Sequence, residues 1–195
     1  MTQKILSMCL LVLAAGIVVA QDEDENRGQP QILFVAEDDQ GTVWANVSLT
    51  LQQTDEPYVP IVVAIQNNLK KNITVSRDRI WLSDLEGLVY QMPSIREWRK
   101  NYGRIVIDRR VVSTGGIPWE VWQRSRRYSA SNFFPDMRSQ QGNTVIDTVS
   151  LRKGNGMVDL FYFDRPRTQF YEKPFFLTVH PKGWEEPIRM RLVLN

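Results

Sequence analysis

Apolar residues at every second position are the main pattern in this chain. The repeat is clear in DRIWLSDLEGLVYQM, residues 78–92, and it is the period of a strand with one buried face. The segment DLEG, residues 84–87, interrupts the repeat with an aspartate and a glycine, both typical of tight turns. We therefore predict a β-hairpin here. Its inward-facing residues are Ile80, Leu82, Leu88, Tyr90 and Met92.

Further strands are predicted on both sides of this hairpin. Pro60 argues for an edge position or for a strand that begins just after it, because proline cannot donate to a sheet. Residues 157–163 are apolar except for Asp159, which is typical of a central strand. The remaining strands are expected at residues 31–36, 42–51, 58–67, 72–76, 143–151, 175–180 and 188–194. Short strands separated by turns predict a mostly β fold, namely an immunoglobulin-like antiparallel β-sandwich.

Residues 93–141 break the two-residue period and form an insertion. Apolar residues three or four apart predict an amphipathic helix from Ile95 to Arg109, with Gly103 as a weak point. Ser94 and Glu97 have the spacing of a capping box. A second short helix is expected at residues 118–126, and residues 128–141 are expected to form a loop. Insertions of this length often have a function.

The N-terminus indicates export. Lys4 precedes an apolar run that ends at Ala20, and residues 1–20 are therefore predicted to be a signal peptide cleaved after Ala20. An uncleaved anchor and lipidation at Cys9 are the alternatives. A flexible acidic leader (21–30) and a single β-sandwich domain (31–195) follow. The expected location is secreted or periplasmic, with no stable membrane span after cleavage.

The composition restricts the chemistry of the mature protein. Cys9 is the only cysteine, so the mature chain has no disulfide and no cysteine-rich zinc site. His180 is the only histidine, and the sequence has no Gly-x-Ser-x-Gly motif for a serine nucleophile that it could assist. The sequence also has no phosphate-binding glycine-rich loop. The formal charge of +2 falls to +1 without Lys4, which does not favour nucleic acid as a partner. We predict no catalytic residues, no metal and no cofactor.

Charge and aromatic residues are nevertheless unevenly distributed. Residues 21–40 have a local charge of −6, whereas residues 93–140 have +6 and many aromatics. Aromatics beside arginines are able to stack on a ligand or a peptide. The alternative is that the insertion's aromatics form a small core at one end of the sandwich, covered by arginine stems. The candidate partner-binding residues are Trp98, Tyr102, Trp119, Trp122, Arg126 and Arg127.

The segment VVAIQNNLKKNITVSRDRIWLSDLEGLVYQM, residues 62–92, resembles bacterial extracellular telokin-like, immunoglobulin-like domains of unknown function. The resemblance rests on a strand ending in asparagine and on a hairpin with Leu82, Asp84, Gly87 and Tyr90. GNGMVDLFYFDRP, residues 154–166, resembles a late glycine turn and strand of the same group. Together the two matching stretches extend the resemblance over about half of the mature chain, and the insertion at residues 93–141 has no counterpart in that group of domains. The resemblance implies an immunoglobulin-like sandwich outside the cytoplasm, without known catalysis or transferable functional residues.

Three functions follow from these features. The first is a non-enzymatic exported module that binds a protein or a cell-envelope polymer through a sheet edge or the insertion. The second is an extracellular hydrolase that uses two carboxylates. The third is a purely structural envelope protein, a homo-oligomer in which the acidic leader of one copy binds the basic middle of the next. We expect the first of these.

Overall fold

The computed structural model describes residues 32–53, 55–108, 128–130 (backbone only), 133–134, 146–166 and 173–194. The fold is mostly β, and its sheets are antiparallel except at one pairing. The strands are β1 (Leu33–Glu37), β2 (Gly41–Asn46), β3 (Tyr58–Asn67), β4 (Ile73–Ser76), β5 (Ile80–Ser83), β6 (Val89–Tyr90), β7 (Tyr128–Ala130), β8 (Thr148–Leu151), β9 (Gly156–Asp164), β10 (Phe175–Val179) and β11 (Ile188–Leu192). The helices are α1 (Ser48–Gln52) and α2 (Ile95–Asn101), with the 3-10 turn η1 (Arg77–Arg79).

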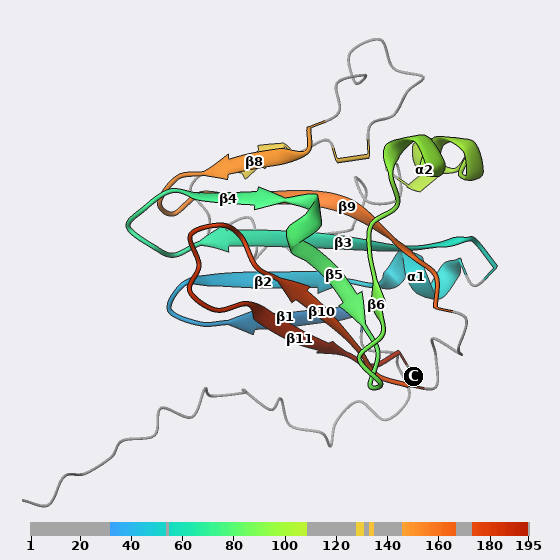
Figure 1. Cartoon of the computed structure of the whole chain (residues 1–195), viewed down its shortest axis with the longest axis horizontal. Coiled ribbons are helices and arrows are strands. Elements are labelled where there is room, and N and C mark those ends of the chain that lie inside the picture. The colour runs from blue at the N-terminus through green and yellow to red at the C-terminus, as the bar shows by residue number, and fades with distance from the viewer. Residues whose placement is uncertain are drawn as a thin grey trace, which may run out of the picture.

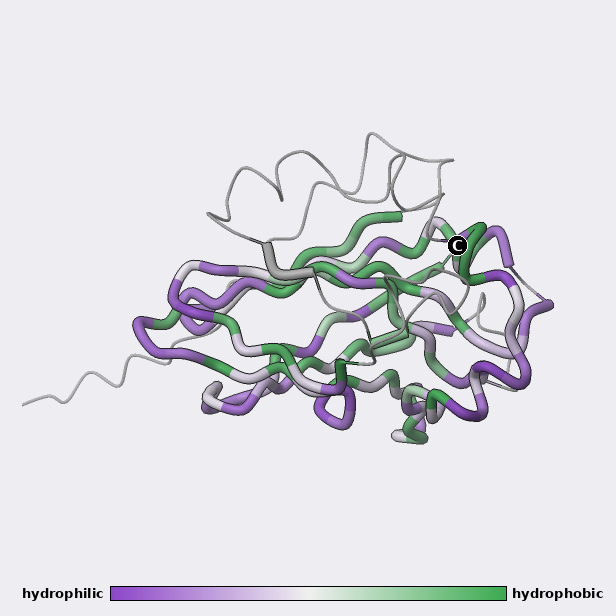
Figure 2. Tube along the Cα trace, turned by 90° about the horizontal axis from the view of Figure 1, so that it is seen from above, coloured by the Kyte–Doolittle hydropathy of each residue, from purple (hydrophilic) through white to green (hydrophobic). Residues whose placement is uncertain are grey.

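Two sheets lie face to face around one core (Figure 1). A five-stranded sheet has the order β1-β2-β3-β9-β7, a four-stranded sheet has the order β11-β10-β5-β6, and β4 pairs with β8. Figure 2 shows hydrophobic residues along the strands and hydrophilic residues at the turns. The alternating residues of both sheets meet in the core and bury their apolar surface, the main stabilising term in such a domain. Examples are Val43, Val59, Ile61, Val63, Ile65, Leu82, Phe161, Phe163, Leu177 and Leu192.

The long strand β3 has the predicted bounds but lies in the middle of its sheet, between β2 and β9. Pro60 is tolerated there because the pairing with β2 ends at Val62, so no β2 residue lies opposite the proline. On that side α1 takes the place of β2, and the Thr50 hydroxyl donates to the Pro60 carbonyl at 2.5 Å. Pro60 is therefore unpaired by a strand on one side only because it lies near one end of a central strand, not because β3 is an edge strand.

The strand predicted for residues 42–51 is wrong in its second half. β2 ends at Asn46, whose side-chain oxygen accepts from the Ser48 N–H at 2.9 Å. Such a side-chain bond two residues along the chain favours a turn over an extended strand. Helix α1 follows, and it buries Leu49 and Thr50. The apolar alternation continued through this turn and concealed it.

The hairpin of β5 and β6 is confirmed, with residues 84–87 as its turn. Gly87 has φ 84°, a conformation that favours glycine. The Asp84 carboxylate accepts from the Leu88 N–H at 2.8 Å and the Tyr90 hydroxyl at 2.9 Å. Burial opposes the charge of Asp84, but these hydrogen bonds outweigh it and hold its pKa below the ordinary value. Leu88 was expected to face inward, yet it is 60% exposed because the turn extends beyond the core.

The insertion contributes both a helix and a strand. The capping box of Ser94 and Glu97 is confirmed at the start of α2, which ends at Asn101, earlier than predicted. Helical backbone resumes at residues 105–108, and Arg109 and the helix expected at 118–126 lie outside the described residues. The loop expected at 128–141 is wrong at its start, because β7 pairs in parallel with β9. None of the helices in the described part of the chain is long and apolar enough to cross a membrane.

Candidate functional site

Two of the candidate partner-binding residues lie in a buried aromatic cluster. Trp98 is 1% exposed, and its ring centroid lies 5.2 Å from that of Phe134 and 5.4 Å from that of Tyr162. Tyr102 is also buried, 5.0 Å from Tyr162. These contacts correspond to the small aromatic core considered as the alternative, and they leave Trp98 and Tyr102 little surface for a partner. Trp119, Trp122, Arg126 and Arg127 lie outside the described residues.

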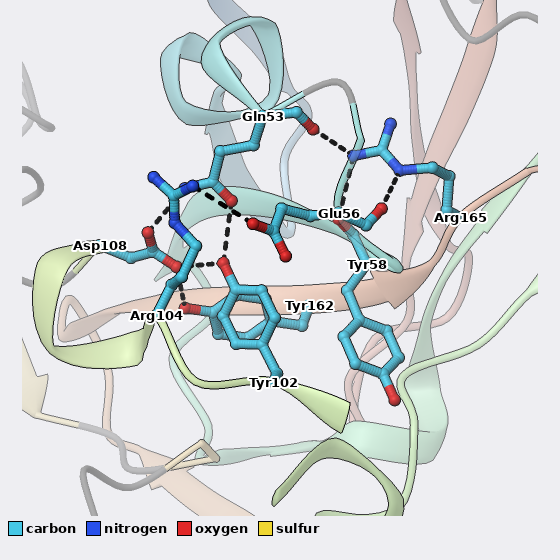
Figure 3. A network of polar contacts seen from close by, with 8 residues as sticks. All are labelled: Gln53, Glu56, Tyr58, Tyr102, Arg104, Asp108, Tyr162 and Arg165. Atoms are coloured by element: carbon cyan, nitrogen blue, oxygen red, sulfur yellow. Dashed lines mark hydrogen bonds and ion pairs between the residues drawn. The ribbon is translucent and has the colours of Figure 1, made fainter. Parts of the chain in front are cut away.

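A buried polar network adjoins this aromatic cluster (Figure 3). Its centre is Asp108, which is 0% exposed. The Gln53 side-chain N–H donates to Asp108 Oδ1 at 2.6 Å, and the Tyr162 hydroxyl donates to Asp108 Oδ2 at 2.8 Å. The Tyr102 hydroxyl lies 2.5 Å from Asp108 Oδ2 and 2.8 Å from Gln53 Oε1, so its single proton is shared between two acceptors. The network joins three segments: the end of α1, the insertion and β9.

The electrostatics of this network favour a structural role. Burial, followed by the hydrogen bond and the negative charge of Asp108, raises the pKa of Tyr102 far above its ordinary value. Tyr102 therefore stays a neutral donor across the physiological pH range. Both oxygens of the Asp108 carboxylate accept hydrogen bonds from the protein, and the carboxylate has no exposed surface. A general base must reach the proton that it removes, which this arrangement does not favour.

Arg165 holds the adjoining loop through backbone carbonyls. Its guanidinium donates to the carbonyls of Gln53 and Glu56, and to that of Tyr58 at 3.1 Å. Arg104 pairs with the Glu56 carboxylate at 3.2 Å at the more exposed rim of the network. The five donors of an arginine fork suit such a set of carbonyls. Arg165 thereby fixes the segment from which Gln53 reaches Asp108.

Arg77 binds the insertion at separate points along the chain. It donates to the Pro93 carbonyl at the start of the insertion and to the Phe133 carbonyl at 3.1 Å. Its guanidinium lies 4.5 Å from the Phe134 ring centroid. The buried Asp159 carboxylate accepts from the Phe133 N–H at 3.0 Å. Burial lowers the pKa of Arg77, and the nearby carboxylates of Asp147 and Asp159 partly oppose that shift. The described part of the insertion is therefore integrated into the domain.

An aromatic and basic surface occurs instead on the four-stranded sheet, on the side away from the core; we call it the outer face. Phe176 is half-buried, and Arg189 stacks on it with its guanidinium carbon 3.9 Å from the ring centroid. Arg189 and Arg191 are exposed, and the described residues provide neither with an ion pair. The pairing places Trp81, Thr178 and Arg189 in one row. Val89, Ser83, Phe176 and Arg191 form the next row.

The hairpin turn continues this surface with apolar residues. Leu85, Leu88 and Val89 are all about half exposed or more, and Val89 belongs to the outer face. Glu86 in the same turn pairs with Lys173 at 3.1 Å, so its charge is locally balanced. This face lies outside the insertion, to which the sequence pattern assigned the candidate partner-binding residues. The signal was present: Trp81, Phe176, Arg189 and Arg191 are the residues that alternate with the core positions of their strands.

Among the described residues, no group of three or more histidine, cysteine, aspartate or glutamate side chains could hold a metal ion. No family model, curated protein or solved structure matches this chain.

Proposed function

We propose that this protein is an exported, non-enzymatic, immunoglobulin-like β-sandwich module that binds a protein or cell-envelope partner through its outer face. The observation that carries the proposal is the exposed pair Arg189 and Arg191 beside Phe176. Arginine and aromatic residues are enriched at the energetically important positions of protein interfaces. The sandwich assignment is supported by two sheets, antiparallel except for the β7–β9 pairing, that share one core.

The distribution of polar groups supports binding over catalysis. The buried groups Asp108 and Asp159 are engaged by donors of the protein itself, whereas Arg189 and Arg191 are exposed and lack ion pairs within the described residues. An exposed guanidinium already stacked on a ring loses little side-chain entropy when a partner binds. The apolar turn beside it adds surface whose burial would favour association. Export follows from residues 1–20 and remains part of the proposal.

Site-specific crosslinking in the producing cell tests this proposal. A photoreactive phenylalanine analogue replaces Phe176 in one variant and Lys153, in an exposed turn before β9, in the control. We expect a discrete adduct from position 176 and none from position 153. Adding Arg189→Gln and Arg191→Gln should lower the adduct yield about tenfold, the effect of losing about 1.4 kcal/mol of binding energy. Adding the matched changes Arg152→Gln and Lys153→Gln to the position-176 variant, which keeps Arg189 and Arg191, should leave the yield unchanged.

The proposal fails if position 176 gives no adduct beyond that of the control position while the variant is exported and folded. It also fails if an adduct forms but its yield is the same with and without Arg189 and Arg191. Far-ultraviolet circular dichroism of each purified variant separates loss of binding from loss of structure.

A further inference from the structure

The acidic leader is the complement of the outer face in charge. Residues 22–25 are Asp-Glu-Asp-Glu, Arg27 follows after one residue, and seven residues lie between Glu25 and β1. The outer face has the opposite charge, from Arg189 and Arg191. Glu86, an acidic residue of the adjoining hairpin turn, is already paired with Lys173.

The leader also begins beside this face. β1 and β11 are in contact, and Figure 1 shows them side by side and running in opposite directions. Ile32, next to the start of β1, therefore lies toward the end of β11 at which Arg191 stands. Six residues lie between Glu25 and Ile32, so seven residue-to-residue steps give a maximum reach of about 23–25 Å. The four strands of the sheet span about 14 Å from the first to the last, so the acidic residues are able to reach the whole face.

We propose that the leader of each molecule binds its own outer face, with the carboxylates of residues 22–25 against Arg189 and Arg191. Individual surface ion pairs are weak, but a short tether raises the effective concentration of the leader to the millimolar range. Binding within one molecule therefore needs only modest intrinsic affinity. The leader would then compete with a partner for the face. That regulatory consequence rests on the proposed function, whereas the binding of the leader does not.

Paramagnetic relaxation measured by NMR tests the contact in the exported protein. Because Cys9 lies in the predicted signal peptide, Gln21→Cys creates a single labelling site in the mature chain. A nitroxide at that site should attenuate the amide signals of Phe176, Arg189 and Arg191 at low salt and spare those of Arg152 and Lys153. The attenuation should disappear in 1 M salt, where the Debye length is about 3 Å.

Two variants with the same label make the test specific. Replacing residues 22–25 by Asn-Gln-Asn-Gln should restore the amide signals of the outer face. Arg189→Gln with Arg191→Gln should likewise restore the amide signal of Phe176. The matched charge removal Arg152→Gln with Lys153→Gln should leave the attenuation in place. Equal attenuation at Phe176 and Arg152, or attenuation that survives neutralisation of the leader, would overturn the proposal.

A mixed sample distinguishes binding within one molecule from binding between copies. Protein that carries the spin label but has natural-abundance nitrogen is mixed with nitrogen-15 protein that carries no spin label. We expect no attenuation at Arg191 in this mixture. Attenuation there would show that a second copy supplies the leader and would contradict the proposal. Crosslinking from position 176 is a separate readout, so failure of partner binding and failure of leader binding are distinguishable.

Discussion

Replacing Asp108 is the sharpest test of the buried network. Asp108→Ala removes the acceptor for Gln53, Tyr102 and Tyr162 and leaves the surrounding aromatic packing unchanged in composition. Tyr102 is able to redirect its proton to Gln53 Oε1, which already lies 2.8 Å away. Gln53 and Tyr162 lose the carboxylate oxygens that accept their hydrogen bonds.

A buried donor that loses its acceptor costs about 1–3 kcal/mol. Two such losses give about 2–6 kcal/mol, and relief of the cost of burying the Asp108 charge offsets part of this sum. We therefore expect Asp108→Ala to lower the free energy of unfolding by about 2–4 kcal/mol. Asp108→Asn retains one acceptor oxygen and the side-chain volume, so its cost should be smaller, about 1–2 kcal/mol.

Urea denaturation followed by fluorescence measures these differences in unfolding free energy, provided that the slope of that free energy against urea concentration is the same in each variant. Two tyrosines supply a matched control. Tyr102→Phe removes a hydroxyl from the network. Tyr58 is also buried, but its hydroxyl accepts only a long hydrogen bond from the Asn101 side chain, at 3.4 Å, and Tyr58→Phe removes that hydroxyl. We expect the first to cost about 1 kcal/mol more than the second. A loss below about 1 kcal/mol for Asp108→Ala, or equal costs for the two tyrosines, would refute the reasoning.

Three further substitutions test local contacts. Gly41→Ala should destabilise by about 1–3 kcal/mol in urea denaturation, because its methyl group would overlap the Trp184 ring, whereas Gly103→Ala meets open space and should be near neutral. Asp84→Asn should be less stable than wild type above about pH 4, the unfolded pKa of aspartate, because the folded pKa is lowered. That difference should shrink as the pH falls through the folded pKa; a gap independent of pH would count against it. Arg77→Lys keeps the charge but loses the planar fork, so residues 95–101 should exchange amide hydrogen faster, and unchanged exchange would contradict the role of Arg77.

The sequence predicted what depends on period and turn chemistry. β3 and the hairpin follow from alternation, and Asp84 and Gly87 mark a turn whose residues fit its geometry. The start of α2 follows from Ser94 and Glu97 because a capping box is a local arrangement. These features need no knowledge of distant segments.

What depends on tertiary contacts could not be predicted. The sequence allows Trp98 and Tyr102 to belong to a binding surface or to a small core, and their contacts with Phe134 and Tyr162 depend on segments distant in the chain. The end of β2 depends on a single side-chain bond of Asn46, which an unbroken apolar alternation hides. The parallel pairing of β7 with β9 joins residues far apart in the sequence, for which no local pattern exists.

Two other arginines are the reason why we propose the outer face, and not the described part of the insertion, as the binding surface. Arg77 and Arg165 both direct their guanidinium groups at backbone carbonyls, where the irregular segments meet the sheet and strand pairing does not satisfy those groups. Their charge and donors are thereby used in holding the domain together. Arg189 and Arg191 lie on β11, a regular edge strand that pairs with β10, and the described residues provide neither guanidinium with an ion pair. Both are exposed and charged and lie beside an aromatic ring, and arginine and aromatic residues are enriched at protein interfaces, which is the basis of our proposal for this face.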